Sequence, residues 1–346
     1  MKILHMADLH LGAKNSRLPG DKQQMLRDEI ADACHRLFAE IKGEVDVVLI
    51  CGDLFHKKNV PAKIAKSFFS AVSQFENPVL YIEGNHDDKF ILPDDLPKNF
   101  VVLSERNDPF EYEDFVFYSK ENLPQRLDQS KNNILLLHGN IETTADNDYV
   151  DINAFLGLEF DYIALGHIHQ TKKYKKGEHI FAYPGSLFAN GFDERGEKGY
   201  LEVEISDKQV TKCNFQRLKQ RRFFVVDCDI SGKNNTNSIY QAILLQFENA
   251  GVSTRDLVKV VLTGDFEEDC DKSVPLLQDK LSEYFYVEIE DKSNLKVDIE
   301  KIKKETLSLK YEFISLLEQD ASLDADAKRA IVNLGIKALK GEDILL

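Results

Sequence analysis

Residues that could do chemistry follow five short apolar runs in the first half of the sequence. Two aspartates, one asparagine and four histidines stand at or just after these runs: Asp8, His10, Asp53, Asn85, His138, His167 and His169. Imidazole and carboxylate groups together are typical ligands of Mn²⁺, Fe²⁺ or Zn²⁺, and they suit Mg²⁺ alone less well. Because seven ligands are too many for one tetrahedral site, the pattern predicts two divalent ions about 4 Å apart that share a carboxylate.

Each motif alone also has a structural explanation. A single Asp-x-His step after a strand is more often structural than catalytic, and Gly84-Asn85-His86-Asp87 could be a turn closed by a side-chain hydrogen bond. All five motifs occur in order, however, and each follows a predicted strand. The combination therefore favours a metal centre that activates water and binds a phosphoryl group. Glycines at positions 52, 84 and 166 would let the backbone approach the ions closely.

Alternating strands and helices must position these residues. The ligands follow predicted strands at Ile3–Leu4, Val45–Cys51, Val79–Ile82, Ile134–Leu137 and Tyr162–Leu165. Amphipathic helices are predicted over Asp21–Lys42 and Pro61–Phe75. Strands that are apolar on both faces and alternate with helices predict an α/β fold with a largely parallel sheet, whose ligands collect at the carboxyl ends of the strands. Alternation in Phe110–Tyr118 and His179–Ile205 predicts a second sheet.

The second half of the sequence has a different pattern. A basic stretch that ends at Arg222 marks a predicted domain boundary, and a β-α-β-α-β order is predicted from there to Ile289. A heptad stripe then follows on a helix of roughly twenty residues, formed by Ile299, Ile302, Thr306, Leu309, Phe313 and Leu316. A second short helix carries Ala327, Ile331, Leu334 and Ala338. Two short helices cannot bury both of their faces alone, so they must dock on the body of the protein or on a partner.

Composition limits the class of protein. The 346 residues include 44 basic and 59 acidic side chains, and the net charge of −15 excludes a protein that coats nucleic acid by bulk electrostatics. No run approaches the roughly 18 apolar residues of a membrane-spanning helix, so we expect no membrane partner. The first ten residues lack the apolar centre of a signal peptide. Five cysteines without a CxxC pair indicate reduced thiols in a cytoplasmic protein.

Local basic clusters leave room for contact with DNA. The candidate DNA-binding residues are Lys57, Lys58, Lys172, Lys173, Lys175, Lys176, Arg217, Lys219, Arg221 and Arg222. These side chains either bind the phosphates of a DNA backbone or belong to solvated loops, and the pattern alone leaves both interpretations open. The cluster that ends at Arg222 favours DNA contact, because it leads into the second predicted unit.

The complete set of motifs resembles that of the calcineurin-like metallophosphoesterases. The resemblance rests on Asp8-x-His10, Gly52-Asp53, Gly84-Asn85-His86-Asp87, His138 and Gly166-His167-x-His169. It implies a two-sheet α/β sandwich with a dinuclear metal site. One ion would be held by Asp8, His10, Asp53 and His169, and the other by Asp53, Asn85, His138 and His167, with Asp53 bridging. His86 would act on the phosphate as general acid or transition-state stabiliser, Asp87 would orient His86, and a metal-bound hydroxide would attack the phosphorus in line.

Three features resemble more narrowly the SbcD-type DNA repair nucleases. They are Gly52-Asp53-Leu54-Phe55-His56, Tyr183-Pro184-Gly185-Ser186 followed by Lys198-Gly199-Tyr200, and the β-α-β-α-β unit. The resemblance implies that His56 lies beside the site. It also implies a nuclease domain over residues 1–215, a smaller α+β DNA-capping domain over 216–291 and a C-terminal helical pair over 292–346. The helical pair is similar to the element with which such nucleases grip an SbcC-type coiled-coil ATPase.

The motifs and the resemblance together predict a Mn²⁺-dependent DNA phosphodiesterase. The resemblance implies that it is active as exonuclease and endonuclease in double-strand-break repair. The implied partners are DNA and the ATPase, and the first helices could form a homodimer contact as in the resembled family.

Two alternatives stay open. A small-molecule phosphodiesterase or protein phosphatase of the same superfamily would not need the second β-α-β-α-β unit. A binding module with a degenerate site would have lost at least one ligand, whereas this set is complete.

Overall fold

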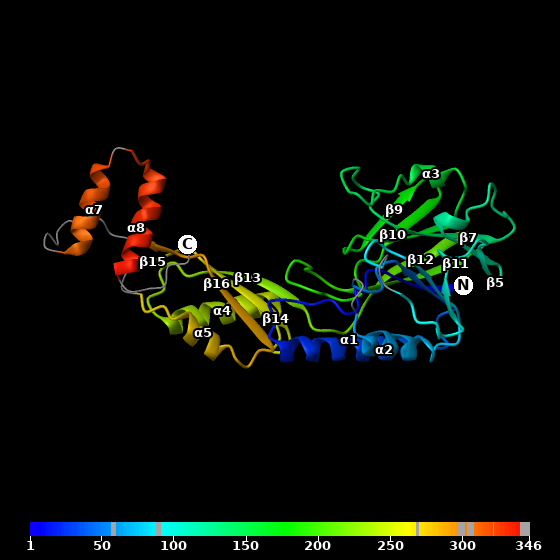
Figure 1. Cartoon of the computed structure of the whole chain (residues 1–346), viewed down its shortest axis with the longest axis horizontal. Helices are drawn as coiled ribbons and strands as arrows, with labels where there is room; N and C mark the ends of the chain where they lie inside the picture. Colours follow the sequence, from blue (N-terminus) through cyan, green and yellow to red (C-terminus); the bar gives the residue numbers. More distant parts are fainter. Residues whose placement is uncertain are drawn as a thin grey trace. The chain divides into compact units, whose positions relative to one another are not determined.

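The computed structural model describes residues 1–56, 60–87, 91–267, 270–296, 302, 308–320 and 322–339. It divides into two compact units, Met1–Arg222 and Phe223–Leu346 (Figure 1). None of the described helices combines the length and apolar character that crossing a membrane requires. The domain roles predicted for residues 1–215, 216–291 and 292–346 stay predictions.

The first unit contains two mixed sheets of six strands each. In the first sheet β1 to β4 run parallel to one another. Beyond β1, strand β11 pairs antiparallel with β1, and β12 pairs antiparallel with β11. The spatial order is β12 (Gln209–Arg217), β11 (Gly199–Ser206), β1 (Lys2–Met6), β2 (Val47–Cys51), β3 (Val79–Ile82) and β4 (Phe100–Val102). The parallel centre of this sheet therefore directs the carboxyl ends of β1, β2 and β3 to one edge.

The second sheet also combines a parallel centre with antiparallel strands at its edges. Strands β6, β7, β8 and β10 run parallel, and the edge strands β5 and β9 run antiparallel to them. The spatial order is β5 (Phe110–Tyr112), β6 (Phe115–Tyr118), β7 (Asn132–His138), β8 (Tyr162–Gly166), β10 (His179–Tyr183) and β9 (Lys172–Lys176). The short helical segments η1 (Lys120–Asn122) and α3 (Asn153–Leu156) lie in its connections.

The two sheets pack face to face. Ile3 and Leu49 of the first sheet share one buried apolar cluster with Ile134 and Ala164 of the second. This arrangement confirms the predicted two-sheet α/β fold. The five strands that precede the ligand motifs are divided between the sheets: β1, β2 and β3 lie in the first, and β7 and β8 in the second. Stacking brings both sets of strand ends together, so that the ligand motifs still meet.

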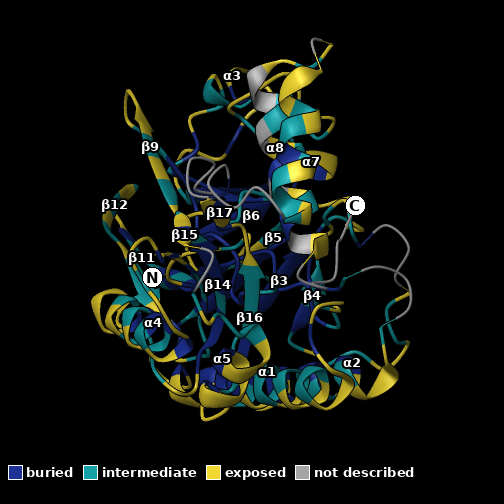
Figure 2. Ribbon diagram, turned by 90° about the vertical axis from the view of Figure 1, so that its left-hand side faces the viewer, coloured by how far each residue is buried: buried dark blue, intermediate teal, exposed yellow. Residues whose placement is uncertain are grey.

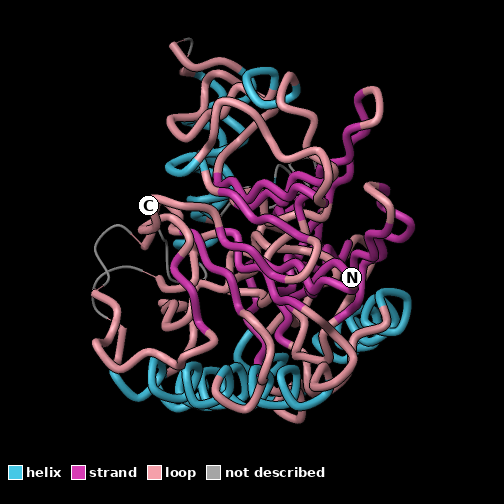
Figure 3. Tube along the Cα trace, turned by 90° about the vertical axis from the view of Figure 1, so that its right-hand side faces the viewer, coloured by secondary structure: helices cyan, strands magenta, loops and turns pink. Residues whose placement is uncertain are grey.

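Helices α1 (Gly20–Glu40) and α2 (Ala62–Val72) lie side by side along the outer face of the first sheet (Figures 1 and 3). Their aromatic residues pack on one another, as in the edge-to-face pair of Phe38 and Phe68 with ring centroids 6.1 Å apart, and share one buried apolar cluster with the sheet. Figure 2 shows the strands beneath them as buried. Since these strands are covered on both faces, their sequences are continuously apolar rather than alternating.

His5 lies in β1 and is fully buried between the sheets. Its Nδ1 lies 2.8 Å from the hydroxyl oxygen of Tyr162, and its Nε2 lies 3.1 Å from the carbonyl oxygen of Leu165. A carbonyl can only accept, so Nε2–H donates to Leu165 and Nδ1 accepts from Tyr162. Burial lowers the pKa of His5 to about 3, although the bond to Leu165 opposes this shift. The folded protein therefore holds His5 as a neutral imidazole.

We expect His5 to make the fold less stable in acid. Its pKa in the folded state lies below the ordinary value of 6.5, so the unfolded chain takes up the proton first as the pH falls. Below that value, this residue should lower the free energy of unfolding by up to about 1.4 kcal/mol per pH unit. His5→Gln, which keeps a donor and an acceptor, should remove this part of the slope. Urea unfolding of both proteins between neutral and mildly acid pH measures it, and equal slopes would contradict the assignment.

The second unit is built on a three-stranded parallel sheet in the order β13-β14-β16. Its elements are β13 (Phe223–Asp229), α4 (Thr236–Ala250), β14 (Leu257–Thr263), α5 (Val274–Lys280) and β16 (Tyr286–Asp291), with a small pair formed by β15 (Asp265–Glu267) and β17 (Asn294–Lys296). Helix α4 begins where the Asn235 side chain accepts from Ser238 N–H and ends at Gly251 in the left-handed conformation. These signals explain why its bounds are sharp.

Helices α7 (Leu309–Gln319) and α8 (Ala325–Leu339) pack on one another and on the core of the second unit. Ile314, Val332 and Ile336 are buried in the same apolar cluster as the three-stranded sheet. One face of the helical pair is therefore satisfied within the chain itself.

The predicted heptad stripe is only partly described. Ile302 is 3% exposed, whereas Ile299 and Thr306 lie outside the described residues. Farther along the stripe, Leu309 and Leu316 are 72% and 70% exposed. Part of the stripe therefore packs on the body, and the leucines of α7 leave an apolar face open to solvent.

Candidate metal centre

Backbone hydrogen bonds join the loops that follow β1 and β2. The N–H of Asp8 donates to the carbonyl of Gly52 at 3.1 Å, and the N–H of His10 donates to the carbonyl of Asp53 at 2.9 Å. A further bond runs from Leu11 to Leu54. The two loops are thereby laid side by side, and their ligand-type side chains share one buried space.

Four predicted ligands have left-handed backbone conformations. The φ angles are 52° for Asp8, 44° for His10, 52° for Asp53 and 106° for His167. Such angles are uncommon for residues with a Cβ and cost on the order of 1–3 kcal/mol each, so they persist only where the surrounding structure fixes them. All four stand where β1, β2 or β8 turns into its loop. This concentration of strain points to a function at this edge of the sheets.

Two glycines allow the strand ends to approach one another. A Cβ on Gly52, whose φ is +83°, would lie 2.1 Å from Nδ1 of His138. A Cβ on Gly84 would lie 2.2 Å from Oδ1 of Asp53. Since a real Cβ never approaches a side chain so closely, any other residue would displace His138 or Asp53.

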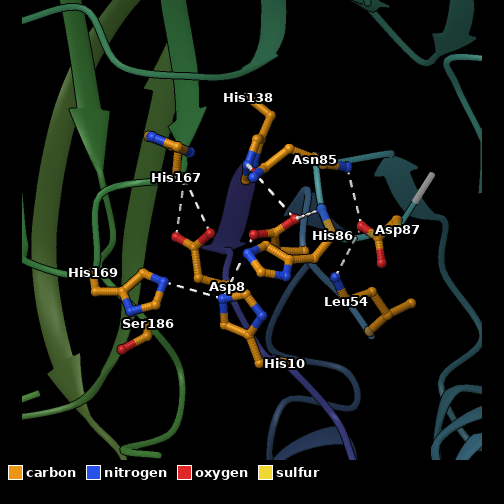
Figure 4. Close-up of polar contacts among 12 residues, drawn as sticks. Asp8, His10, Leu54, Asn85, His86, Asp87, His138, His167, His169 and Ser186 are labelled. Carbon is orange, nitrogen blue, oxygen red and sulfur yellow. Dashed lines mark hydrogen bonds and ion pairs between the residues drawn. The ribbon is translucent and has the colours of Figure 1, made fainter. Parts of the chain in front are cut away.

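Asp8, His10 and His169 gather on one side of the site. Their ligand-type atoms lie within 4.8 Å of one another. Nε2 of His10 lies 3.1 Å from Nε2 of His169 and 3.5 Å from Oδ2 of Asp53 (Figure 4). The Asp8 carboxylate accepts the N–H of His167 at 3.1 Å on both oxygens. The structure thus brings together the residues predicted to hold the first ion.

Asp53, Asn85 and His138 gather on the other side. Nε2 of His138 lies 3.0 Å from Oδ1 of Asn85 and 3.7 Å from Oδ1 of Asp53. Nδ1 of His138 lies 2.9 Å from the carbonyl oxygen of Cys51, which can only accept. In the neutral ring that binds a metal, Nδ1 would donate its hydrogen to Cys51 and Nε2 would be the ring atom that offers a lone pair. Asp53 faces His10 with one oxygen and His138 with the other, so it lies where a carboxylate shared by two ions would lie.

His167 is placed differently from the other predicted ligands. Its ring centroid lies 5.3 Å from that of His138, but its Nε2 lies 3.1 Å from Oδ2 of Asp146. Potential ligand atoms of Asp146, Asp148 and His167 form a group of their own beside the main cluster. No sequence pattern points to Asp146, because this residue lies in a polar loop without a preceding strand or motif.

The predicted catalytic His86 lies at the margin of the cluster. Its ring centroid is 5.0 Å from that of His10, and it stacks on the ring of His56 at 5.4 Å with an interplanar angle of 20°. Its backbone N–H donates to Oδ1 of Asp53 at 2.9 Å. The same loop therefore positions the His86 ring and fixes the central carboxylate.

Asp87 is buried and ties the two loops together. Its carboxylate accepts the backbone N–H groups of Leu54 at 3.1 Å, Phe55 at 2.9 Å and Gly84 at 3.0 Å (Figure 4). These bonds hold the loop after β3 against the loop after β2. Asp87 thus fixes the backbone of the loop that carries His86.

Burial dominates the electrostatics of the cluster. It raises the pKa of Asp8 to about 8 and that of Asp53 above its usual range, and it lowers the pKa of His10 to about 3 and that of His138 to about 4. Neutral imidazoles present lone pairs, and buried carboxylates are stable as anions only beside a cation. Nδ1 of His10 is buried and has no hydrogen-bond partner among the described residues. This donor set fits divalent metal ions.

Glu194 is a further residue that the sequence did not reveal. It lies in the connection between β10 and β11, and its Oε1 is 3.0 Å from Nδ1 of His169. Burial alone would raise the pKa of Glu194, but the hydrogen bond with His169 and the charges of His169 and Lys198 lower it to about 2. Glu194 is therefore an anion beside a predicted ligand.

The basic residues predicted to contact DNA are placed in several ways. Five are engaged by neighbours: Lys172 by Glu142, Lys173 by the Cys213 carbonyl, Lys176 by Asn153, Arg217 by Glu197 and Arg221 by Glu29. Lys175 and Lys219 are exposed, and Arg222 is half-buried. Lys57 and Lys58 lie outside the described residues. Contact with DNA stays a prediction for all ten.

Residues 1–208 match the family described as the calcineurin-like phosphoesterase superfamily domain. This match covers more than half of the chain, and the two-sheet fold agrees with it. The chain belongs to this superfamily, and it is a metal-dependent phosphoesterase.

Individual relatives agree with this assignment. The DNA double-strand break repair protein Mre11 of Methanocaldococcus jannaschii is 27% identical over 272 residues, which cover 70% of this chain and 73% of that protein. The uncharacterized metallophosphoesterase YhaO of Bacillus subtilis is 25% identical, with 70% and 66% covered. One subunit of the nuclease SbcCD of Bacillus subtilis is 35% identical over 92 residues, or 25% of this chain and 22% of that protein. The predicted resemblance to SbcD-type nucleases is confirmed.

We expect Asp53→Ala to weaken the binding of both ions together, because His10 and His138 face opposite oxygens of this one carboxylate. Elemental analysis after loading with Mn²⁺ and desalting should show a fall from about two ions per chain to fewer than one. Asp108→Ala, at an exposed position, is the matched control. Retention of one tightly bound ion would argue against a bridging role for Asp53.

Proposed function

We propose that this chain is a DNA phosphodiesterase, with exonuclease and endonuclease activity, that works in double-strand-break repair with two Mn²⁺ ions. The observation that carries the proposal is the convergence of ligand-type side chains from both sheets around Asp53. Relatives named as a double-strand break repair protein and as a nuclease subunit support the choice of DNA. The proposal includes a cytoplasmic location, since all five cysteines, each within the described residues, are thiols rather than disulfides.

The proposed ligand sets follow the two sides of the site. Asp8, His10, Asp53 and His169 would hold one ion, and Asp53, Asn85, His138 and His167 would hold the other. When bound, a pair of divalent ions activates water and offsets the negative charge of a phosphoryl group. Mixed imidazole and carboxylate donors favour Mn²⁺ over Mg²⁺. His167 reaches the second set only by giving up its bond to Asp146 or by using its other ring nitrogen.

The remaining residues of the site act on the substrate and on protons. The His86 ring is half-buried at the margin of the cluster, where it could donate a proton to the departing oxygen of a phosphodiester. The stacked ring of His56 limits the directions in which His86 can turn. Asp87 holds the loop that carries His86, so the chain fixes this group before substrate arrives.

DNA is favoured over a small phosphate ester by features outside the ligand set. The exposed Lys175 and Lys219 are candidates to bind DNA phosphates, since neither is engaged by an acid among the described residues. The second unit, Phe223–Leu346, adds a complete sheet and the described helices α4, α5, α7 and α8, which a minimal phosphatase does not need. A small-molecule phosphodiesterase or protein phosphatase remains the alternative, because the superfamily match is confined to residues 1–208.

His86→Ala should keep both ions and the fold but lower phosphodiesterase activity about 100-fold or more, as expected for a general acid. The assay follows end-labelled linear duplex and hairpin DNA in Mn²⁺, beside p-nitrophenyl phosphate and bis-p-nitrophenyl phosphate. His35→Ala, at a half-buried histidine of α1 that lies 3.3 Å from Ser67, is the matched control. Undiminished activity of His86→Ala would refute its role. Rapid monoester hydrolysis without DNA cleavage by the parent protein would favour the phosphatase alternative.

The helical pair is proposed to bind an SbcC-type ATPase. One relative is named as a subunit of a nuclease, and α7 leaves Leu309 and Leu316 largely exposed although its opposite face is buried. Two exposed leucines one heptad apart suit a coiled-coil partner, which repeats with the same period. The predicted homodimer contact through α1 and α2 stays a prediction.

Replacing both Leu309 and Leu316 with glutamate should weaken binding of the ATPase at least about tenfold, because two apolar anchors are lost. The fold should survive, since both side chains are exposed. Leu245→Glu on α4, where the leucine is 55% exposed, is the matched control in the same unit. Interferometry with the coiled-coil fragment of the ATPase measures the affinity. Equal affinities of the double variant and the control would remove α7 from the proposed interface.

A further inference from the structure

The imidazole of His169 is held between the metal cluster and a carboxylate. Its Nε2 faces Nε2 of His10 at 3.1 Å, and its Nδ1 faces Oε1 of Glu194 at 3.0 Å. A carboxylate accepts hydrogen bonds, so Nδ1 of His169 carries the hydrogen and donates it to Glu194. When the ring is neutral, as a metal ligand must be, the atom left to present a lone pair toward the cluster is Nε2. Glu194 therefore selects the ring form of His169 that can bind a metal.

Glu194 is itself fixed by three groups. Its Oε2 lies 3.3 Å from the hydroxyl of Ser186, 3.2 Å from the N–H of Asn190 and 3.6 Å from Nζ of Lys198. Its side chain is 13% exposed. A carboxylate with this many donors loses little rotational freedom when it binds His169, and its bond is correspondingly directional.

Lys198 completes the arrangement. Its ammonium group is buried and donates to the hydroxyl of Ser186 at 2.8 Å and to the carbonyl of His169 at 3.1 Å. A buried ammonium group is costly unless it is paired, and Glu194 is the acid beside it. Lys198 thus holds the backbone of His169 while Glu194 holds its ring. Figure 4 shows Ser186 next to His169 in this position.

The connection that supplies these groups is joined to the ligand loops. Ser186 pairs with Ala7 in a parallel bridge, and the N–H of Leu187 donates to the Ala7 carbonyl at 3.3 Å. Ala7 precedes Asp8 directly. Ser186 and Leu187 therefore lie beside Ala7 at the end of β1, next to the ligand Asp8.

We propose that Glu194 is a positioning residue that orients His169 and sets the affinity of the ion on the Asp8, His10 and His169 side. Lys198 and Ser186 hold Glu194 in place for this task. The inference rests on the proposed metal centre but not on the identity of the substrate. The two sides of the site would then differ in what orients their histidines. His169 is held by the Glu194 carboxylate, whereas His138 is held by the uncharged Cys51 carbonyl.

The test compares Mn²⁺ binding by the full chain and by Glu194→Ala, Glu194→Gln and Glu197→Ala with titration calorimetry. Removing a carboxylate that orients a ligand imidazole typically weakens metal affinity about 10–100-fold. We expect Glu194→Ala to show this loss for one ion and to leave the other unchanged. Glu194→Gln still offers an oxygen to Nδ1 and should show a smaller loss. Glu197, a neighbour half-exposed in an ion pair with Arg217, is the matched control and should show none.

Melting curves in EDTA separate orientation from folding. A positioning role leaves the melting temperature of metal-free Glu194→Gln close to that of the parent protein while its affinity for one ion falls. Equal affinities of the parent and Glu194→Ala would overturn the inference, as would an equal loss of both ions. If Glu194→Ala fails to fold, Glu194→Gln decides: a parent-like affinity overturns the inference and a one-ion loss upholds it. A parent protein that binds no Mn²⁺ would instead defeat the proposed function itself.

Discussion

The structure depends on the cost of burying ionisable groups where the two sheets meet. Asp8 and Asp53 are 0% and 2% exposed, and His10 is 5% exposed. Without a cation, burial favours the protonated carboxyl groups of Asp8 and Asp53 and the neutral rings of His10 and His138. Divalent ions reverse this balance, because they stabilise the carboxylates as anions and use the imidazole lone pairs. The apolar sheets supply the low-dielectric surroundings that make both effects large.

The rest of the first unit can be understood as support for that cluster. Strands covered on both faces give rigid ends, and strained residues such as Asp8 and Asp53, with φ of 52° each, follow directly after them. Gly52 and Gly84 remove the Cβ atoms that would hold the two loops apart. Asp87 then joins these loops through their backbone N–H groups. Each of these features fixes where the ligand side chains lie. The ligands alone therefore do not account for the site.

The sequence predicted those parts of the molecule that local patterns determine. Apolar runs revealed the strands, and the polar residues after them revealed the cluster around Asp53. Contacts between distant segments could not be predicted from local patterns. The division of five strands between two sheets depends on how the sheets stack. Glu194 contacts His169 only because the connection after β10 folds back on the site. Arg221 is a similar case. Its guanidinium pairs with Glu29 of α1, far away in the sequence, and no local pattern indicates this ion pair.

The acidic character of the chain is compatible with an anionic substrate because charge is balanced locally. Two divalent ions would bring four positive charges to a space that holds two carboxylates, Asp8 and Asp53, and they would leave an excess that favours a phosphodiester. Glu194 does not reduce this excess positive charge, since Lys198 lies beside it and offsets its negative charge. The net charge of −15 is carried by the rest of the molecule and is screened beyond about 8–10 Å at physiological ionic strength. The overall field of the chain therefore does not by itself exclude an anionic substrate from the site.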